Sequence, residues 1–393
     1  MSKLLSRQGV RDGLLGLALL SAALALILYP QESMSAAREG LTLCGNVIIP
    51  SLFPFFVLSS LVVELGLASY LGRVLEPVMA PLFRVNGACA SAFVLGIIGG
   101  YPVGAKTALS LYEKGLCSKT EAERLLAFCN NSGPAFILGV VGAGVFASSG
   151  VGLLLCLAHG AASLLVGLLF RFYKAREPAG RGGRVSQIQA TRITAAFTGS
   201  IQSGLHSILN ICAFVVFFTV VIRMLTLTGV LPALARAAAL LLAPLGFDQA
   251  SAEQLLTGVV ELSSGVWALS GGVGFSGRVP LAAFMLGWAG LSVHCQVLSF
   301  AGGSGLNLRT YVAGKLLHGL FSAGLTAVLV RLLPLDAPVS SYLAQQVDSI
   351  AGLDFHTALV VSLAAAWVVW ACFLLLAARM VSKSSGKRRR NVV

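Results

Sequence analysis

The chain has 393 residues, of which 56% are hydrophobic and only 11% are charged. Soluble domains carry roughly 25% charged residues, so the composition excludes an ordinary soluble protein and indicates a protein that crosses a membrane several times. The net charge of +13 would suit nucleic acid, but the basic residues gather in the N-terminal head, a central linker and the C-terminal tail. Such clusters mark cytoplasmic segments, so we expect a lipid bilayer and no nucleic acid as partner.

Eight apolar stretches have the length, about 20 residues, that crosses the hydrocarbon core. They are Gly13–Tyr29, Leu41–Val63, Leu125–Phe146, Val151–Phe172, Leu205–Leu225, Leu281–Ala301, Tyr311–Leu333 and Thr357–Ala378. Gly13–Tyr29 follows a basic head, as a cleaved signal peptide would, but the many later spans favour a retained helix. Ala88–Leu111 and Ala252–Gly272 are interrupted by Gly, Pro or Ser. We interpret them as re-entrant hairpins, because counting either as a span would place a basic cluster outside.

The order of elements predicts an inverted repeat, in which each copy has an apolar span, an interfacial segment, a hairpin and a broken span. The predicted fold class is an all-α polytopic membrane protein with two re-entrant helical hairpins, two broken transmembrane helices and both termini in the cytoplasm. The predicted units are an N-terminal transmembrane helix (1–39), a first repeat with the following helix (40–172), a basic cytoplasmic linker (173–196), a second, inverted repeat (197–303), two C-terminal helices with an acidic outer loop (304–380) and a polybasic tail (381–393).

Four breaks place polar or helix-breaking residues inside apolar sequence. They read GGYPVGAK at 99–106, NNSGP at 130–134, ELSSG at 261–265 and SVHCQ at 292–296. Unwound backbone at membrane depth is tolerated only where it packs in protein or lines a wet cavity. Paired breaks in two halves indicate a transporter's binding site, so we expect the four breaks to meet.

The first two breaks could bind a small anion through helix N-termini and side-chain donors. A lysine inside the membrane is energetically costly, so we expect Lys106 to have a function, such as contact with the substrate. The alternative is that its side chain only extends to the inner membrane interface. The asparagine-rich break could equally be an ordinary turn. The predicted substrate-binding residues here are Gly100, Tyr101, Gly104, Lys106, Asn130, Asn131 and Ser132.

The second half adds Ser263, Ser264 and Gln296 as predicted substrate contacts. Glu261 could carry a coupling proton, pair with Lys106 or coordinate a cation, and a structural ion pair is the alternative. His294 could carry a proton near neutral pH, although a lone histidine is more often a packing residue.

Catalysis finds little support in the sequence. It contains no Gly-x-Ser-x-Gly elbow, no Walker loop and no cluster with metal-ligand spacing. We therefore predict no enzyme activity, no metal and no cofactor. The sequence leaves open whether protons or sodium ions are coupled to transport and whether the chain forms a homo-oligomer.

The string at 99–106, together with 46–50 and 130–134, resembles the YlbJ family of sporulation integral membrane proteins, also called SpoVV. That family belongs to the nucleoside-recognition or Gate class, which is similar to half of a concentrative nucleoside transporter. The resemblance spans roughly residues 40–333. It implies a location in the outer forespore membrane of an endospore-forming bacterium and transport of dipicolinic acid. Dipicolinic acid is a small planar dianion, so Glu261 would suit it only if that carboxylate were protonated or paired.

The expected function is therefore transport of a small anionic substrate, with dipicolinic acid as the first choice. A nucleoside or related small molecule is the alternative within the transporter class. A receptor or scaffold of the spore envelope that transports nothing is the alternative from a different class.

Overall fold

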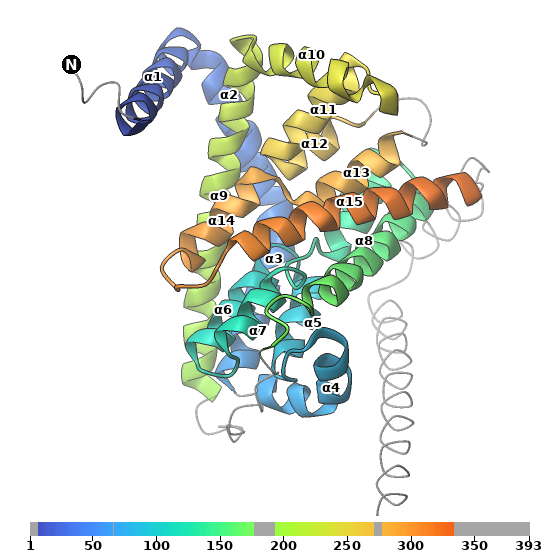
Figure 1. Cartoon of the computed structure of the whole chain (residues 1–393). Helices are drawn as coiled ribbons and strands as arrows, with labels where there is room; N and C mark the ends of the chain where they lie inside the picture. The colour runs from blue at the N-terminus through green and yellow to red at the C-terminus, as the bar shows by residue number, and fades with distance from the viewer. Residues whose placement is uncertain (1–6, 66, 177–192, 271–276, 334–393) are drawn as a thin grey trace, which may run out of the picture.

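The computed structural model describes residues 7–65, 67–176, 193–270 and 277–333, and these ranges are helical without any β-strand (Figure 1). The all-α prediction is confirmed. Within these described ranges, five helical stretches are long and apolar enough to cross a membrane, namely Val10–Leu28, Ser149–Phe170, Thr194–Leu227, Arg278–Ala301 and Arg309–Leu332. The predicted span Thr357–Ala378, most of the linker, the outer loop and the tail lie outside the described residues.

The chain starts with five consecutive helical segments: α1 (Arg7–Leu28), α2 (Pro30–Leu43), a π-helical turn (Cys44–Ile48), α3 (Ile49–Glu64) and α4 (Leu67–Phe83). The predicted span Leu41–Val63 is thus helical, but its helix begins earlier, at Pro30. Proline suits a first helical turn because its missing N–H would have no partner there.

Two pairs of helices form hairpins at the first and third predicted breaks. The first consists of α5 (Cys89–Gly99) and α6 (Val103–Glu113), and the second of α11 (Gln249–Val260) and α12 (Leu262–Trp267). Each closes on a pair of glycines. A Cβ on Gly104 would lie 3.0 Å from the Cα of Gly96, and one on Gly265 only 2.1 Å from the Cα of Gly258, so glycine is required for this approach.

The predicted break at 130–134 is present between α7 (Lys119–Leu126) and a π-helical segment (Ala135–Val145), which is followed by α8 (Ser149–Phe170). The break predicted at 292–296 is wrong by a few residues. The chain breaks between α13 (Arg278–Trp288) and α14 (Gly290–Ala301), where Ala289 and Gly290 have φ of 79° and 81°. A Cβ on Gly290 would lie 2.9 Å from the backbone N of Leu262, so close packing against α12 determines the position.

The remaining helices are α9 (Ile193–Leu227), α10 (Val230–Leu242) and α15 (Arg309–Leu332). In Figure 1, α9 runs the height of the molecule beside α2 and α3, while α15 lies against α13 and α8. One hydrophobic core joins the two halves of the chain, since it contains Tyr101 and Val141 together with Val266 and Leu286. This core holds both hairpins next to both broken helices.

Candidate substrate-binding site

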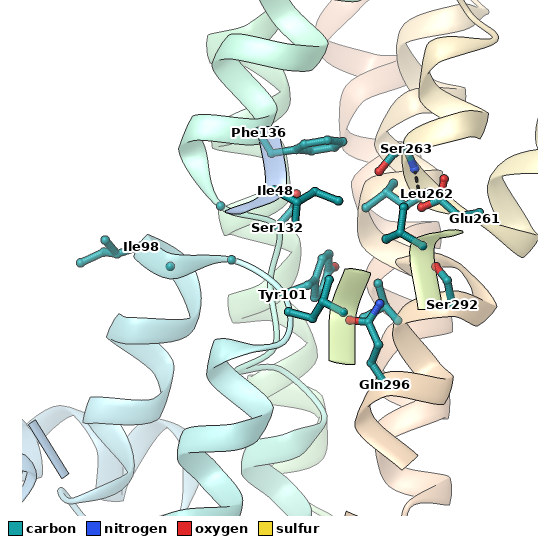
Figure 2. A pocket seen from close by; sticks show the side chains of 16 residues that line it. Ile48, Ile98, Tyr101, Ser132, Phe136, Glu261, Leu262, Ser263, Ser292 and Gln296 are labelled. Carbon is teal, nitrogen blue, oxygen red and sulfur yellow. Dashed lines mark hydrogen bonds between the residues drawn. The ribbon is translucent and has the colours of Figure 1, made fainter. Parts of the chain in front are cut away.

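A cavity of about 90 Å³ lies where the hairpins and broken helices meet. Figure 2 shows Tyr101, Ser132 and Phe136 facing Glu261, Ser263, Ser292 and Gln296 across it. The cavity is lined by Ile48, Ile98, Gly99, Gly100, Tyr101, Ser132, Gly133, Phe136, Ile211, Val215, Glu261, Leu262, Ser263, Ser292, Val293 and Gln296. Since all four polar strings contribute, the expectation that they meet is confirmed.

The predicted site residues divide into two groups. Those that line the cavity are Gly100, Tyr101, Ser132, Glu261, Ser263 and Gln296. Those that do not line it are Gly104, Lys106, Asn130, Asn131, Ser264 and His294. The second group supports the cavity wall or lies in neighbouring hollows.

Glu261 caps the helix that follows it. Its backbone is extended, and its carboxylate accepts hydrogen bonds from the N–H groups of Ser263 at 3.0 Å and Ser264 at 2.6 Å. The first N–H groups of a helix otherwise attract an anion, so the chain's own carboxylate already occupies these donors. Pairing between Glu261 and Lys106, one of the sequence alternatives, does not occur in the described structure, because Lys106 contacts α9 instead.

Asn130 ties the first hairpin to the rest of the site. Its Oδ1 accepts a hydrogen bond from the N–H of Ala105 at 3.4 Å, and its Nδ2 donates to the hydroxyl of Tyr311 at 3.4 Å. Asn131 donates from Nδ2 to the carbonyl of Phe128 at 3.0 Å. Both amides are fully buried, so they hold the unwound segment in place behind the cavity.

Lys106 lies on the side of the first hairpin that faces α9. Its Nζ donates to the carbonyl of Ser203 at 3.2 Å, to the hydroxyl of Ser203 at 3.0 Å and to the hydroxyl of Ser207. The ammonium also lies 5.8 Å from the centre of the Phe56 ring. Lys106 therefore joins α6 to α9 next to the cavity and does not line it.

His294 is buried between the rings of Trp288 and Tyr311, at centroid distances of 4.3 and 5.3 Å. Within the described residues, neither ring nitrogen has a hydrogen-bond partner, and the Ser292 hydroxyl that lines the cavity has none either. Buried polar atoms are normally satisfied. Ser292 is thus available to a ligand or to water in the cavity.

Two larger hollows adjoin the cavity along α9. One is lined by Gly199, Ser203 and Ile211, and Ile211 also lines the central cavity. The other is lined by Thr219 and Ser263, and Ser263 is again shared with the cavity. The three spaces follow one another along the helix from residue 199 to 219, a stretch of about 30 Å at 1.5 Å per residue, which matches the hydrocarbon thickness of a bilayer.

The sequence analysis missed three ionisable residues that lie just behind the cavity: His159 on α8, and Lys315 and His318 on α15. All three are buried, and the rings of His159 and His318 are 4.2 Å apart. The sequence could have revealed them, because ionisable residues in the middle of apolar spans indicate function. Lys315 and His318 are also three residues apart, so they share one face of their helix.

The helices and the cavity together define a transporter-like integral membrane protein. Residues 47–151 match the Gate family profile, described as nucleoside recognition. The chain is 31% identical over 320 residues to the sporulation integral membrane protein YlbJ of Bacillus subtilis (strain 168), which covers 76% of this chain and 78% of that protein. The chain belongs to the YlbJ family of sporulation integral membrane proteins.

Two solved structures of CNTnw share lower similarity with the chain. An inward-facing, substrate-bound state gives a TM-score of 0.48 at 14% identity and covers 82% of this chain and 87% of CNTnw. An outward-facing state gives 0.46 at 15% identity and covers 84% and 88%.

Proposed function

We propose that the chain transports a small polar metabolite, which binds in the central cavity on its way across the membrane. The observation that carries this proposal is the series of three adjoining hollows along α9, with the cavity in the middle. A scaffold would not need an unpartnered serine hydroxyl and a carboxylate facing a common space inside a helical membrane protein.

The proposed substrate is a small planar dicarboxylate, with dipicolinic acid as the specific candidate. The reason for this choice is the resemblance of the sequence to a family that is named for sporulation. Lys106 also supports the choice, since it lines the hollow next to the cavity together with Ser203 and adds a positive charge to the route that an anion would take. The start of α6 beside Tyr101 adds the positive end of a helix dipole. Phe136 and Tyr101 provide flat surfaces for a pyridine ring.

A nucleoside is the second candidate, and one observation favours it. Among the described residues that line the cavity there is a carboxylate, Glu261, but no lysine or arginine. A carboxylate and an amide such as Gln296 suit hydroxyl and N–H donors of an uncharged ligand. The Gate profile over residues 47–151, described as nucleoside recognition, agrees with this alternative.

The test is uptake of labelled dipicolinate and of labelled uridine into proteoliposomes that contain the full chain, with and without a proton or sodium gradient. We expect saturable dipicolinate uptake that unlabelled dipicolinate inhibits and uridine does not. Uptake of uridine without uptake of dipicolinate would show that the substrate is a nucleoside and not a dicarboxylate. Absence of uptake for both, in a preparation that unfolds cooperatively, would support the receptor or scaffold alternative.

A further inference from the structure

Lys315 is a fully buried lysine in the middle of α15, with 0% of its surface exposed. Its Nζ donates to the hydroxyl of Tyr101 at 2.7 Å and to the backbone carbonyl of Asn130 at 2.8 Å, and it lies 3.1 Å from Nδ1 of His318. An ammonium has three N–H donors, and these three acceptors match them. When Nδ1 of His318 is the unprotonated ring nitrogen, the site can therefore accept a hydrogen bond from each N–H of a positively charged lysine.

The charge on Lys315 has no negative partner in the described part of the chain. The ion pairs found there join other residues. His318 is neutral when its Nε2 donates to the carbonyl of His159, 2.9 Å away, and its Nδ1 accepts from Lys315. A buried charge without a counter-ion is strongly unfavourable, and such a group otherwise tends to lose its charge. A negative group in the cavity would therefore favour the charged form of Lys315.

The cavity lies directly beyond the residues that hold Lys315. Tyr101 lines the cavity and receives the lysine's hydrogen bond, and the centre of its ring is 4.7 Å from Nζ. Ser132 also lines the cavity, and its N–H donates to Nε2 of His159 at 3.0 Å. The cluster of Lys315, His318 and His159 thus forms the layer immediately behind the cavity wall.

We propose that Lys315 is the counter-charge for an anionic substrate in the central cavity, acting through space from behind Tyr101. Electrostatic attraction is stronger in a low-dielectric interior than in water, so direct contact is unnecessary. Among the described residues, the one carboxylate that lines the cavity is Glu261, and it accepts hydrogen bonds from the N–H groups of Ser263 and Ser264. This inference rests on the proposed transport function and assigns the charge of the substrate.

The test compares His318→Glu with His318→Gln in the full chain. The two substituted side chains have the same shape and differ in charge. Glutamate would pair with Lys315 and neutralise it, whereas glutamine keeps an acceptor and leaves the positive charge. The two probes are pyridine-2,6-dicarboxylate and its uncharged diamide, pyridine-2,6-dicarboxamide, and the measurement is their dissociation constants for the purified protein.

We expect the parent to prefer the dicarboxylate and His318→Gln to retain that preference. His318→Glu should weaken dicarboxylate binding at least about tenfold relative to His318→Gln, while diamide binding changes less than about twofold. A purely structural role would weaken both probes together. Lys315→Met, which removes the ammonium and keeps the apolar stem, should cause the same selective loss and serves if the His318 variants do not fold.

Equal dicarboxylate affinity in His318→Glu and His318→Gln would overturn the inference and leave the proposed function standing. So would a Lys315→Met protein that retains the parent's preference. A parent that binds the diamide as tightly as the dicarboxylate would also overturn it. A folded parent that binds neither probe would overturn the dicarboxylate proposal and this inference together.

Discussion

Neutralising Glu261 should have opposite effects on the two proposed substrate classes. For a dicarboxylate, Glu261→Gln removes a like charge from the cavity and should improve affinity about threefold to tenfold. One amide oxygen can still accept a hydrogen bond from the start of α12, so the helix cap is partly kept. The measurement is dipicolinate binding to the purified variant, with Glu253→Gln, which lies on α11 away from the cavity, as control.

The same variant has the opposite effect on a nucleoside. A hydrogen bond from a ligand hydroxyl to a charged carboxylate contributes about 1.5–3 kcal/mol, so Glu261→Gln should then weaken binding by about 10–150-fold. A loss of dipicolinate affinity in Glu261→Gln, with Glu253→Gln unchanged, would contradict the dicarboxylate proposal.

Lys106 should act on the rate of transport more than on affinity. Its ammonium links α6 to Ser203 and Ser207 on α9 and does not line the central cavity. We expect Lys106→Met to change the dissociation constant less than about threefold but to lower the uptake rate at saturating substrate, because a charged hydrogen bond between the two elements is lost. Lys106→Arg should retain part of the rate. A tenfold loss of affinity with an unchanged maximal rate would contradict this prediction and indicate that Lys106 contacts the substrate.

At the scale of elements, the first hairpin depends on its close contact with the broken helix. A Cβ on Gly104 would lie 2.0 Å from the carbonyl oxygen of Cys129 and 3.0 Å from Gly96. Both obstacles are backbone atoms and cannot rotate away. Gly104→Ala should therefore destabilise the protein by about 1–3 kcal/mol or more, which thermal unfolding in detergent would detect.

The matched control is Gly160→Ala in α8, where a Cβ would meet nothing within 4 Å. There alanine is the better helix former, so its unfolding temperature should not fall. If Gly104→Ala unfolds like the parent, the hairpin moves freely against the broken helix.

The sequence predicted the hairpins and the unwound segment at 130–134 because helix breakers inside apolar runs are a local signal. It misplaced the fourth break, since a positive φ at Ala289 depends on how closely α12 approaches Gly290. It also could not predict the contacts of Lys315 with Tyr101 and Asn130. Those contacts span 214 and 185 residues of sequence and depend on tertiary packing.

At the scale of the whole molecule, the proposed transport function makes the two hollows along α9 the access routes to the central cavity. The hollow at Lys106 lies towards the start of α9, next to the basic linker in sequence, and the hollow at Thr219 lies towards its end. If the linker is cytoplasmic, the first hollow opens towards the cytoplasm. The orientation of the chain in the membrane thus decides which face each hollow serves.

The charge pattern predicts that orientation. Residues 173–196 contain Lys174 and several arginines, whereas residues 334–356 contain three aspartates and no lysine or arginine; positive loops remain on the cytoplasmic side. In a cysteine-free background, an impermeant thiol reagent applied to intact cells should label Ser341→Cys and should label Ser186→Cys only after permeabilisation. Each variant serves as the other's control for reagent access.

Labelling of Ser186→Cys in intact cells, with Ser341→Cys protected, would show that the orientation is the reverse of the predicted one. Labelling of both in intact cells would contradict the odd number of crossings between linker and outer loop and, with it, the inverted repeat.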